Sequence, residues 1–81
     1  MSIRVLFFAS LADITGRREA LLDASAFTDL ASVYSRCEND FPGLRAHRSS
    51  VMFALNSEFA DPGSRVRDGD EVAFFPPVSG G

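Results

Sequence analysis

The end of the chain carries the group with the most distinctive chemistry. The sequence closes with Phe75-Pro76-Pro77-Val78-Ser79-Gly80-Gly81. Two consecutive prolines end a strand, remove two backbone donors and favour an extended polyproline conformation. Six residues at about 3.3–3.6 Å each span roughly 20 Å. Because glycine has no Cβ, the last acyl carbon is unhindered. Residues 76–81 are therefore predicted to form an extended, flexible tail that can enter another protein's active site.

The carboxylate of Gly81 needs activation before a nucleophile can attack it, because its leaving group would be oxide. An acyl-adenylate made with ATP has a good leaving group, and attack by sulfur then gives a thiocarboxylate or a thioester. The chain lacks the phosphate-cradling glycine loop with lysine and contains no lysine at all. We therefore expect that it binds no cofactor itself and that a partner enzyme uses the ATP.

Composition is that of one small globular domain. Of the 81 residues, 46% are hydrophobic and 23% are charged, which is ordinary for a soluble protein. The net charge of −3 disfavours nucleic acid as a partner, because a phosphate backbone is bound by clustered basic residues. No apolar run reaches the ~18 residues of a membrane helix, and no secretion signal is visible at the start. The one cysteine, Cys37, forms no internal disulfide, so a cytoplasmic location is expected.

The first third of the chain predicts a hairpin of two strands. Residues 3–9 are rich in strand formers, and alternation divides them between two faces: Ile3, Val5 and Phe7 on one, Arg4, Leu6 and Phe8 on the other. Arg4 marks the solvent side, which leaves Leu6 and Phe8 partly exposed. Residues 10–18 are predicted to be a turn, and residues 19–22 a second strand.

Apolar residues then recur at helical spacing from Ala26 to Phe41. This period predicts one amphipathic helix of about 15 residues, with Ser25 as its N-cap. Pro42-Gly43 ends the helix. A helix of this kind packs its apolar stripe on a sheet.

The rest of the domain reads as strands separated by turns. Residues 51–56 are nearly apolar and predict a central strand, residues 59–60 a short one, and residues 71–75 the last. Asp68-Gly69-Asp70 is a hairpin-type signal. In the last strand Val72 and Phe74 share one face, whereas Glu71, Ala73 and Phe75 share the other. The order predicts an α+β fold of β-grasp, or ubiquitin-like, type over residues 1–75, with a mixed four- to five-stranded sheet and one main helix across one face.

Nearly end to end, the sequence resembles the family of small, sulfur-carrying subunits of molybdopterin synthase, the MoaD family. The most specific segments are Val5-Leu6-Phe7-Phe8-Ala9 and Asp68-Gly69-Asp70-Glu71-Val72-Ala73-Phe74-Phe75-Pro76-Pro77-Val78-Ser79-Gly80-Gly81, with Phe53-Ala54-Leu55-Asn56 between them. The central helix matches in pattern only.

The resemblance implies a non-catalytic, sulfur-donating subunit of a sulfurtransferase complex. Gly81 would be adenylated by a ubiquitin-activating-like adenylyltransferase with ATP and converted to a thiocarboxylate by a sulfur donor enzyme. The tail, including Val78, Ser79 and Gly80, would then enter the large synthase subunit. There it would pass sulfur to cyclic pyranopterin monophosphate in molybdenum cofactor biosynthesis. The family's synthase is a heterotetramer of two small and two large subunits.

Family members dock partners through an apolar surface around the tail. By position this surface falls on Phe8, Phe59 and Phe75, and the strand alternation already turns Phe8 and Phe75 outward. The alternative is that these rings belong to the core.

Other reactive side chains fit structural roles. Cys37 lies on the apolar stripe of the helix, where a free cysteine is commonly buried. His47 has no second ligand nearby, so no metal site is predicted. Turn chemistry explains Asp68, Asp70 and Glu71 better than a cation site does. Three other functions stay open: a sulfur carrier of another pathway such as thiamine synthesis, a ubiquitin-like protein modifier, and an interaction module with an inert tail.

Overall fold

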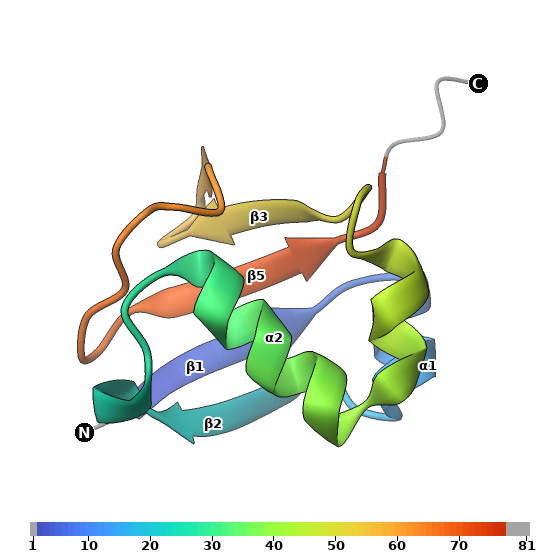
Figure 1. Ribbon diagram of the computed structural model, residues 1–81, viewed down its shortest axis with the longest axis horizontal. Coiled ribbons are helices and arrows are strands. Elements are labelled where there is room, and N and C mark those ends of the chain that lie inside the picture. Colours follow the sequence, from blue (N-terminus) through green and yellow to red (C-terminus); the bar gives the residue numbers. More distant parts are fainter. Residues whose placement is uncertain (1, 78–81) are drawn as a thin grey trace.

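The computed structural model describes residues 2–77, in which one sheet is covered on one face by helix (Figure 1). Its strands are β1 (Ser2–Phe7), β2 (Glu19–Asp23), β3 (Met52–Leu55), β4 (Glu58–Ala60) and β5 (Glu71–Phe75). They lie in the order β2-β1-β5-β3-β4. The pair β1 and β5 is parallel, and the other neighbours are antiparallel. This mixed sheet confirms the predicted α+β, β-grasp fold.

Helices lie on one face and at one end of the sheet. The main helix α2 (Leu30–Asp40) crosses the face, while α1 (Ser10–Thr15) and the 3-10 helix η2 (Pro42–His47) cover the end where β1 finishes (Figure 1). A second 3-10 turn, η1 (Ala24–Ala26), joins β2 to the segment before α2. The outer face of the sheet, opposite α2, carries no helix among residues 2–77.

The predicted alternation of β1 and β5 is confirmed. In β1 the residues Ile3, Val5 and Phe7 are buried, and Leu6 is only partly covered. In β5 the residues Val72 and Phe74 are fully buried beneath α2. Because side chains of a strand point alternately to its two faces, the other positions of both strands face outward.

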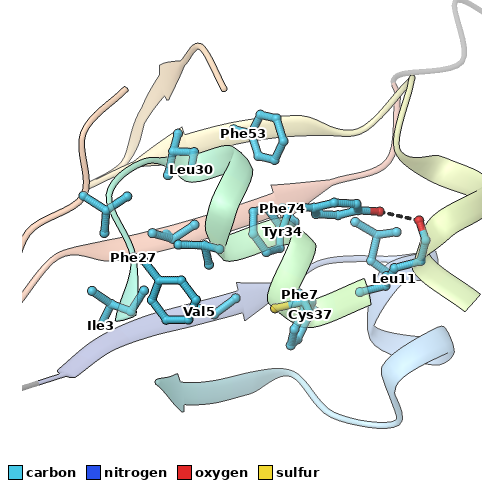
Figure 2. Packing of buried hydrophobic residues seen from close by; sticks show 14 residues of the cluster. Ile3, Val5, Phe7, Leu11, Phe27, Leu30, Tyr34, Cys37, Phe53 and Phe74 are labelled. Carbon is cyan, nitrogen blue, oxygen red and sulfur yellow. Dashed lines mark hydrogen bonds between the residues drawn. The ribbon is translucent and has the colours of Figure 1, made fainter. Parts of the chain in front are cut away.

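The core lies between α2 and the sheet and centres on Phe74 (Figure 2). The Tyr34 ring meets the Phe74 ring edge-on at 5.0 Å, and Phe53 does so at 5.4 Å. Such edge-to-face pairs are preferred by the ring quadrupoles. The Tyr34 hydroxyl donates a hydrogen bond of 2.6 Å to the Leu44 carbonyl (the dashed line in Figure 2), which ties α2 to η2 and satisfies a buried polar group.

The prediction of a turn over residues 10–18 is wrong, because α1 occupies most of that segment. Its six residues bury only Leu11 and Thr15, so the apolar period is too short to identify from the sequence. Gly16 ends α1 with a φ of 74°, in the left-handed region that favours glycine. Thr15 and Gly16, which lie in the predicted turn, therefore form the end of a helix.

The start of the main helix was predicted several residues too early. Ser25 is no N-cap of α2; it lies in η1, where its Oγ donates to Asp23. The N-cap is Asp29, whose carboxylate accepts from the Ser32 amide at 2.9 Å in a capping box. Phe27 is buried, but its backbone is extended, so its apolar match to the helical period was a coincidence of spacing. Helix α2 therefore has 11 residues.

One expectation for the sheet needs correction, and another is confirmed. Asp68-Gly69-Asp70 is a turn, but it does not join two paired strands, because β5 pairs with β1 and β3. Asp68 and Asp70 instead accept hydrogen bonds from the amides of Ser2 and Arg67. The strand β3 is an inner strand, as its apolar sequence suggested, but β5 holds the middle of the sheet.

Candidate functional site

Three phenylalanine rings gather on the outer face, beside the point where β5 ends. Phe8 follows β1, Phe75 is the last residue of β5, and Phe59 lies in β4. Phe8 and Phe75 stack with ring centroids 4.6 Å apart and planes at 9°, and Phe59 lies 6.1 Å from Phe75. Phe8 is 41% exposed, Phe59 is 74% exposed and Phe75 is half-buried. The alternative that these rings form part of the core does not hold.

Parallel pairing explains why Phe8 and Phe75 meet. Phe7 of β1 lies opposite Phe74 of β5, so the next residue of each strand turns to the outer face at the same level. The Phe8 amide also donates to the Phe74 carbonyl at 3.2 Å. The sequence segments Phe7-Phe8 and Phe74-Phe75 thus each contribute one ring to the core and one to the surface.

The apolar surface extends from the sheet to the start of the tail. A hollow of about 260 Å³ is lined by Leu6, Phe8, Ala54, Ser57, Phe59, Glu71, Ala73 and Phe75. A neighbouring hollow of about 370 Å³ is lined by Phe8, Ala9, Met52, Phe59, Phe75, Pro76 and Pro77. Contiguous exposed apolar surface commonly marks a site of protein association. The predicted tail residues Val78, Ser79, Gly80 and Gly81 lie outside the described residues.

The lining residues other than the phenylalanines were not predicted as part of a site. Ala54 and Ala73 form the floor of the first hollow, and Leu6, Met52 and Glu71 stand around the two hollows. Alternation alone placed Leu6 and Ala73 on the outer face. Only the register of the sheet shows that Ala54 of β3 lies directly beside Ala73.

A cluster of charged groups on the outer face reaches the hollow through Glu71, which lines it. Arg4 donates from Nε to Glu19 at 2.6 Å, and its Nη1 lies 3.6 Å from Glu71. The hydrogen bond to Glu19 raises the pKa of the Arg4 guanidinium, so Arg4 stays charged. These pairs are solvent-exposed and contribute little to stability. Their arrangement leaves two carboxylates around one guanidinium.

Cys37 is buried in the core on the apolar side of α2, as predicted. Burial raises the pKa of the Cys37 thiol to about 12, so the nucleophilic thiolate is scarce at neutral pH. Within residues 2–77, no group of three histidine, cysteine or acidic side chains is placed to hold a metal ion. No helix in that same range is both long and apolar enough to span a membrane.

Residues 5–81 match the ThiS family model, and the chain therefore belongs to the ThiS family. Three relatives, each called a molybdopterin synthase sulfur carrier subunit, are similar over their length. The Caenorhabditis elegans protein is 36% identical, covering 100% of this chain and 99% of the relative. The human protein is 33% identical, over 98% of this chain and 93% of the human protein. The Escherichia coli protein is also 33% identical, over 98% of this chain and 99% of its own length. The resemblance found in the sequence is confirmed.

Solved structures show the same fold. SAMP1 from Haloferax volcanii has a TM-score of 0.83 at 28% identity, over 100% of both chains. A protein–protein complex of subunits 1 and 2 of the molybdopterin-converting factor from Helicobacter pylori contains a chain with a TM-score of 0.70 at 26% identity, again over 100% of both chains. The ubiquitin-like expectation therefore holds across the described sheet and helices.

Proposed function

We propose that this chain is the sulfur carrier subunit of a molybdopterin synthase and that the Gly81 carboxylate carries the sulfur. In this account Gly81 is the attachment point of a covalent cargo, and the catalytic groups belong to partner enzymes. The domain holds the tail and presents a surface that those partners bind.

The chemistry proceeds in three steps. An adenylyltransferase joins the Gly81 carboxylate to AMP from ATP and releases pyrophosphate. A persulfide group of the sulfur donor then attacks the acyl carbon and AMP leaves. A thiol reduces the resulting acyl disulfide, which leaves a thiocarboxylate on Gly81 and a disulfide on the donor side. In the large subunit, the thiocarboxylate sulfur bonds to a carbon of cyclic pyranopterin monophosphate, and water then hydrolyses the acyl–sulfur bond, so that Gly81 again ends in a carboxylate. Splitting one difficult acyl substitution into activated steps is the advantage of covalent intermediates.

One observation carries the proposal: the last strand ends inside an exposed aromatic surface. Phe75 stacks on Phe8 and leads directly into Pro76 and Pro77, which line the same surface. A partner that binds these rings is thereby held at the root of residues 76–81. Full-length similarity to proteins called sulfur carrier subunits supports the same function.

We propose that the large subunit docks on Phe8, Phe59 and Phe75, and their exposure beside the end of β5 supports this. Aromatic residues dominate binding energy at interfaces because they bury large area at low entropic cost. A heterotetramer of two small and two large subunits is the assembly we propose. The Helicobacter pylori complex of subunits 1 and 2 supports a large-subunit partner.

A reconstituted assay tests the function. Wild-type protein is combined with an adenylyltransferase, ATP, a sulfur donor, the large subunit and cyclic pyranopterin monophosphate, and dithiolene formation is measured. Deleting Gly81 is expected to abolish product while far-UV circular dichroism and the thermal midpoint stay unchanged. Product formation by the truncated chain would disprove the carrier mechanism.

Protein modification is the second candidate function. It is favoured by the similarity to SAMP1, since a Haloferax volcanii chain 25% identical over 95% of this one is a small archaeal modifier protein. An isopeptide bond from Gly81 to a target lysine needs the same adenylate. Having no lysine, this chain cannot form lysine-linked chains of itself. Covalent conjugates of the tagged protein on a denaturing gel of host extract would support this function over the first.

A further inference from the structure

The outer face of the sheet has a depression at its middle, because the two residues there are alanines with short side chains. Ala73 of β5 pairs with Leu6 on one side and with Ala54 on the other, and Ala54 pairs with Phe59. These four residues form one row across β1, β5, β3 and β4. Ala54 is 6% exposed and Ala73 is 7% exposed, although no helix of residues 2–77 covers them. Their taller neighbours shield them, so the row has a depression at its centre.

The depression has the size and lining of a socket for one side chain. Six of its eight lining residues are apolar, and its volume is about 260 Å³. A dry apolar cavity of about 150 Å³ accommodates a benzene ring. The hollow is therefore large enough for a leucine, methionine or phenylalanine side chain entering from outside.

The rim of the hollow opposite the aromatic rings is acidic. Glu71 lines it, and the nearest described cation, Arg4, lies closer to Glu19 than to Glu71 (2.6 Å against 3.6 Å). Two carboxylates share one guanidinium, so this part of the face has a net negative charge, in a chain whose net charge is −3. A partner group placed here is favoured if it is basic, because complementary charge steers encounter and fixes register.

We propose that the hollow floored by Ala54 and Ala73 receives one apolar side chain of the large subunit and that a basic residue beside that side chain pairs with Glu71. This inference rests on the proposed function, since it names how the same partner is recognised. It adds to the docking on the aromatic surface a specific requirement: the partner must present an apolar side chain for the hollow and, next to it, a basic side chain for Glu71.

Two other occupants fit less well. A second copy of this chain that presented the same face would bring Glu71 and Glu19 toward their own equivalents, and like charges across an interface are unfavourable. The four residues after Pro77 supply one large apolar side chain, Val78, and no basic group. Neither occupant provides both an apolar side chain that fits the hollow and a basic group for the acidic rim.

Filling the hollow without removing any aromatic ring tests the inference. Ala73→Leu places a side chain where the partner's knob would sit, and Ala46→Leu adds the same atoms at an exposed position of η2. Affinity for the large subunit of the same host is measured by calorimetry. We expect Ala73→Leu to weaken binding at least tenfold and Ala46→Leu to change it less than twofold, with unchanged thermal midpoints.

The rim is tested separately, which keeps the inference falsifiable if Ala73→Leu folds poorly. Glu71→Gln keeps the shape of the side chain and removes its charge, so binding at low salt should weaken about fivefold and depend less on ionic strength. Tenfold tighter self-association of the wild type than of Ala73→Leu would instead assign the hollow to a second copy.

The outcomes separate this inference from the proposed function. If wild-type protein binds the large subunit and supports dithiolene formation while Ala73→Leu and Glu71→Gln bind equally well, the hollow is not the socket and the carrier function stands. If the wild type neither binds the large subunit nor supports transfer, the proposed function is wrong and the inference falls with it.

Discussion

The rings of Phe8 and Phe75 stack almost in parallel, 4.6 Å apart, at the level where β1 and β5 end. The residues just before them, Phe7 and Phe74, pair in register and lie in the core. Aromatic contacts of this kind contribute about 0.5–1.5 kcal/mol beyond the area they bury. The same two strand ends thus anchor the fold on one face and build the partner surface on the other, next to the tail root.

Phe59 separates binding from stability most cleanly, because it is 74% exposed on the edge strand β4. Phe59→Ala should change the free energy of unfolding by less than about 0.5 kcal/mol, as at other exposed positions. If Phe59 is an anchor of the interface, the same change should weaken large-subunit binding by about 2 kcal/mol, or roughly 30-fold. Calorimetry and urea denaturation measure the two quantities.

Leu21 provides the matched control. It is 69% exposed and lies opposite Arg4 on the same outer face, but on β2, away from the tail root. Leu21→Ala should leave both stability and affinity nearly unchanged. Equal losses of affinity for the two variants would mean that the whole apolar face, and not the aromatic surface, determines binding.

Alkaline pH should destabilise the fold through two buried groups. Burial raises the pKa of Cys37 to about 12 and that of Tyr34 to about 12. In the unfolded chain the cysteine thiol has a pKa of about 8.5 and the tyrosine hydroxyl a pKa of about 10. Above about pH 9 the unfolded state has released protons that the folded state keeps. Stability should therefore fall with rising pH, by up to about 1.4 kcal/mol per pH unit for each group.

Urea denaturation between pH 7 and pH 11 checks this expectation. Cys37→Ala removes the thiol, so its stability should hold to about pH 10 before the Tyr34 effect begins. A wild-type stability that stays flat to pH 11 would show that these groups titrate normally in the folded protein.

The helix N-cap gives a test of the corrected fold. The Asp29 carboxylate accepts the Ser32 amide hydrogen at 2.9 Å, so Asp29→Ala should cost about 1 kcal/mol and lower the thermal midpoint by about 4–8 °C. Ser25→Ala alters an exposed turn in η1 and should cost less than about half as much. The reverse order of the two midpoints would restore the helix start predicted from the sequence.

Much of the fold follows from alternation and period, because these report burial directly. Ile3, Val5 and Phe7 could be assigned to the core from their spacing and from Arg4 among their neighbours. Helix α1 could not be predicted, because a helix of six residues is too short to show a helical repeat of apolar residues. The N-cap of α2 was missed because Ser25 and Asp29 both have cap chemistry, and only the backbone before Leu30 decides between them.

The candidate site divides in the same way. Phe8 and Phe75 could be placed on the outer face from strand parity, and the family resemblance added Phe59. The hollow beside them could not be predicted, because Ala54 and Ala73 come from strands that meet only in the sheet. Alanine carries no functional signal in a sequence; its importance here lies in what it leaves open between taller side chains.

Intact-mass spectrometry of the protein isolated from its native host tests the central claim most directly. A carrier of sulfur at Gly81 should show a species about 16 Da heavier than the calculated mass, because sulfur replaces one oxygen of the carboxylate. Fragmentation should place the added mass on the C-terminal glycine. Only the unmodified mass, from cells actively making molybdopterin, or mass gained on any other residue, would contradict the account.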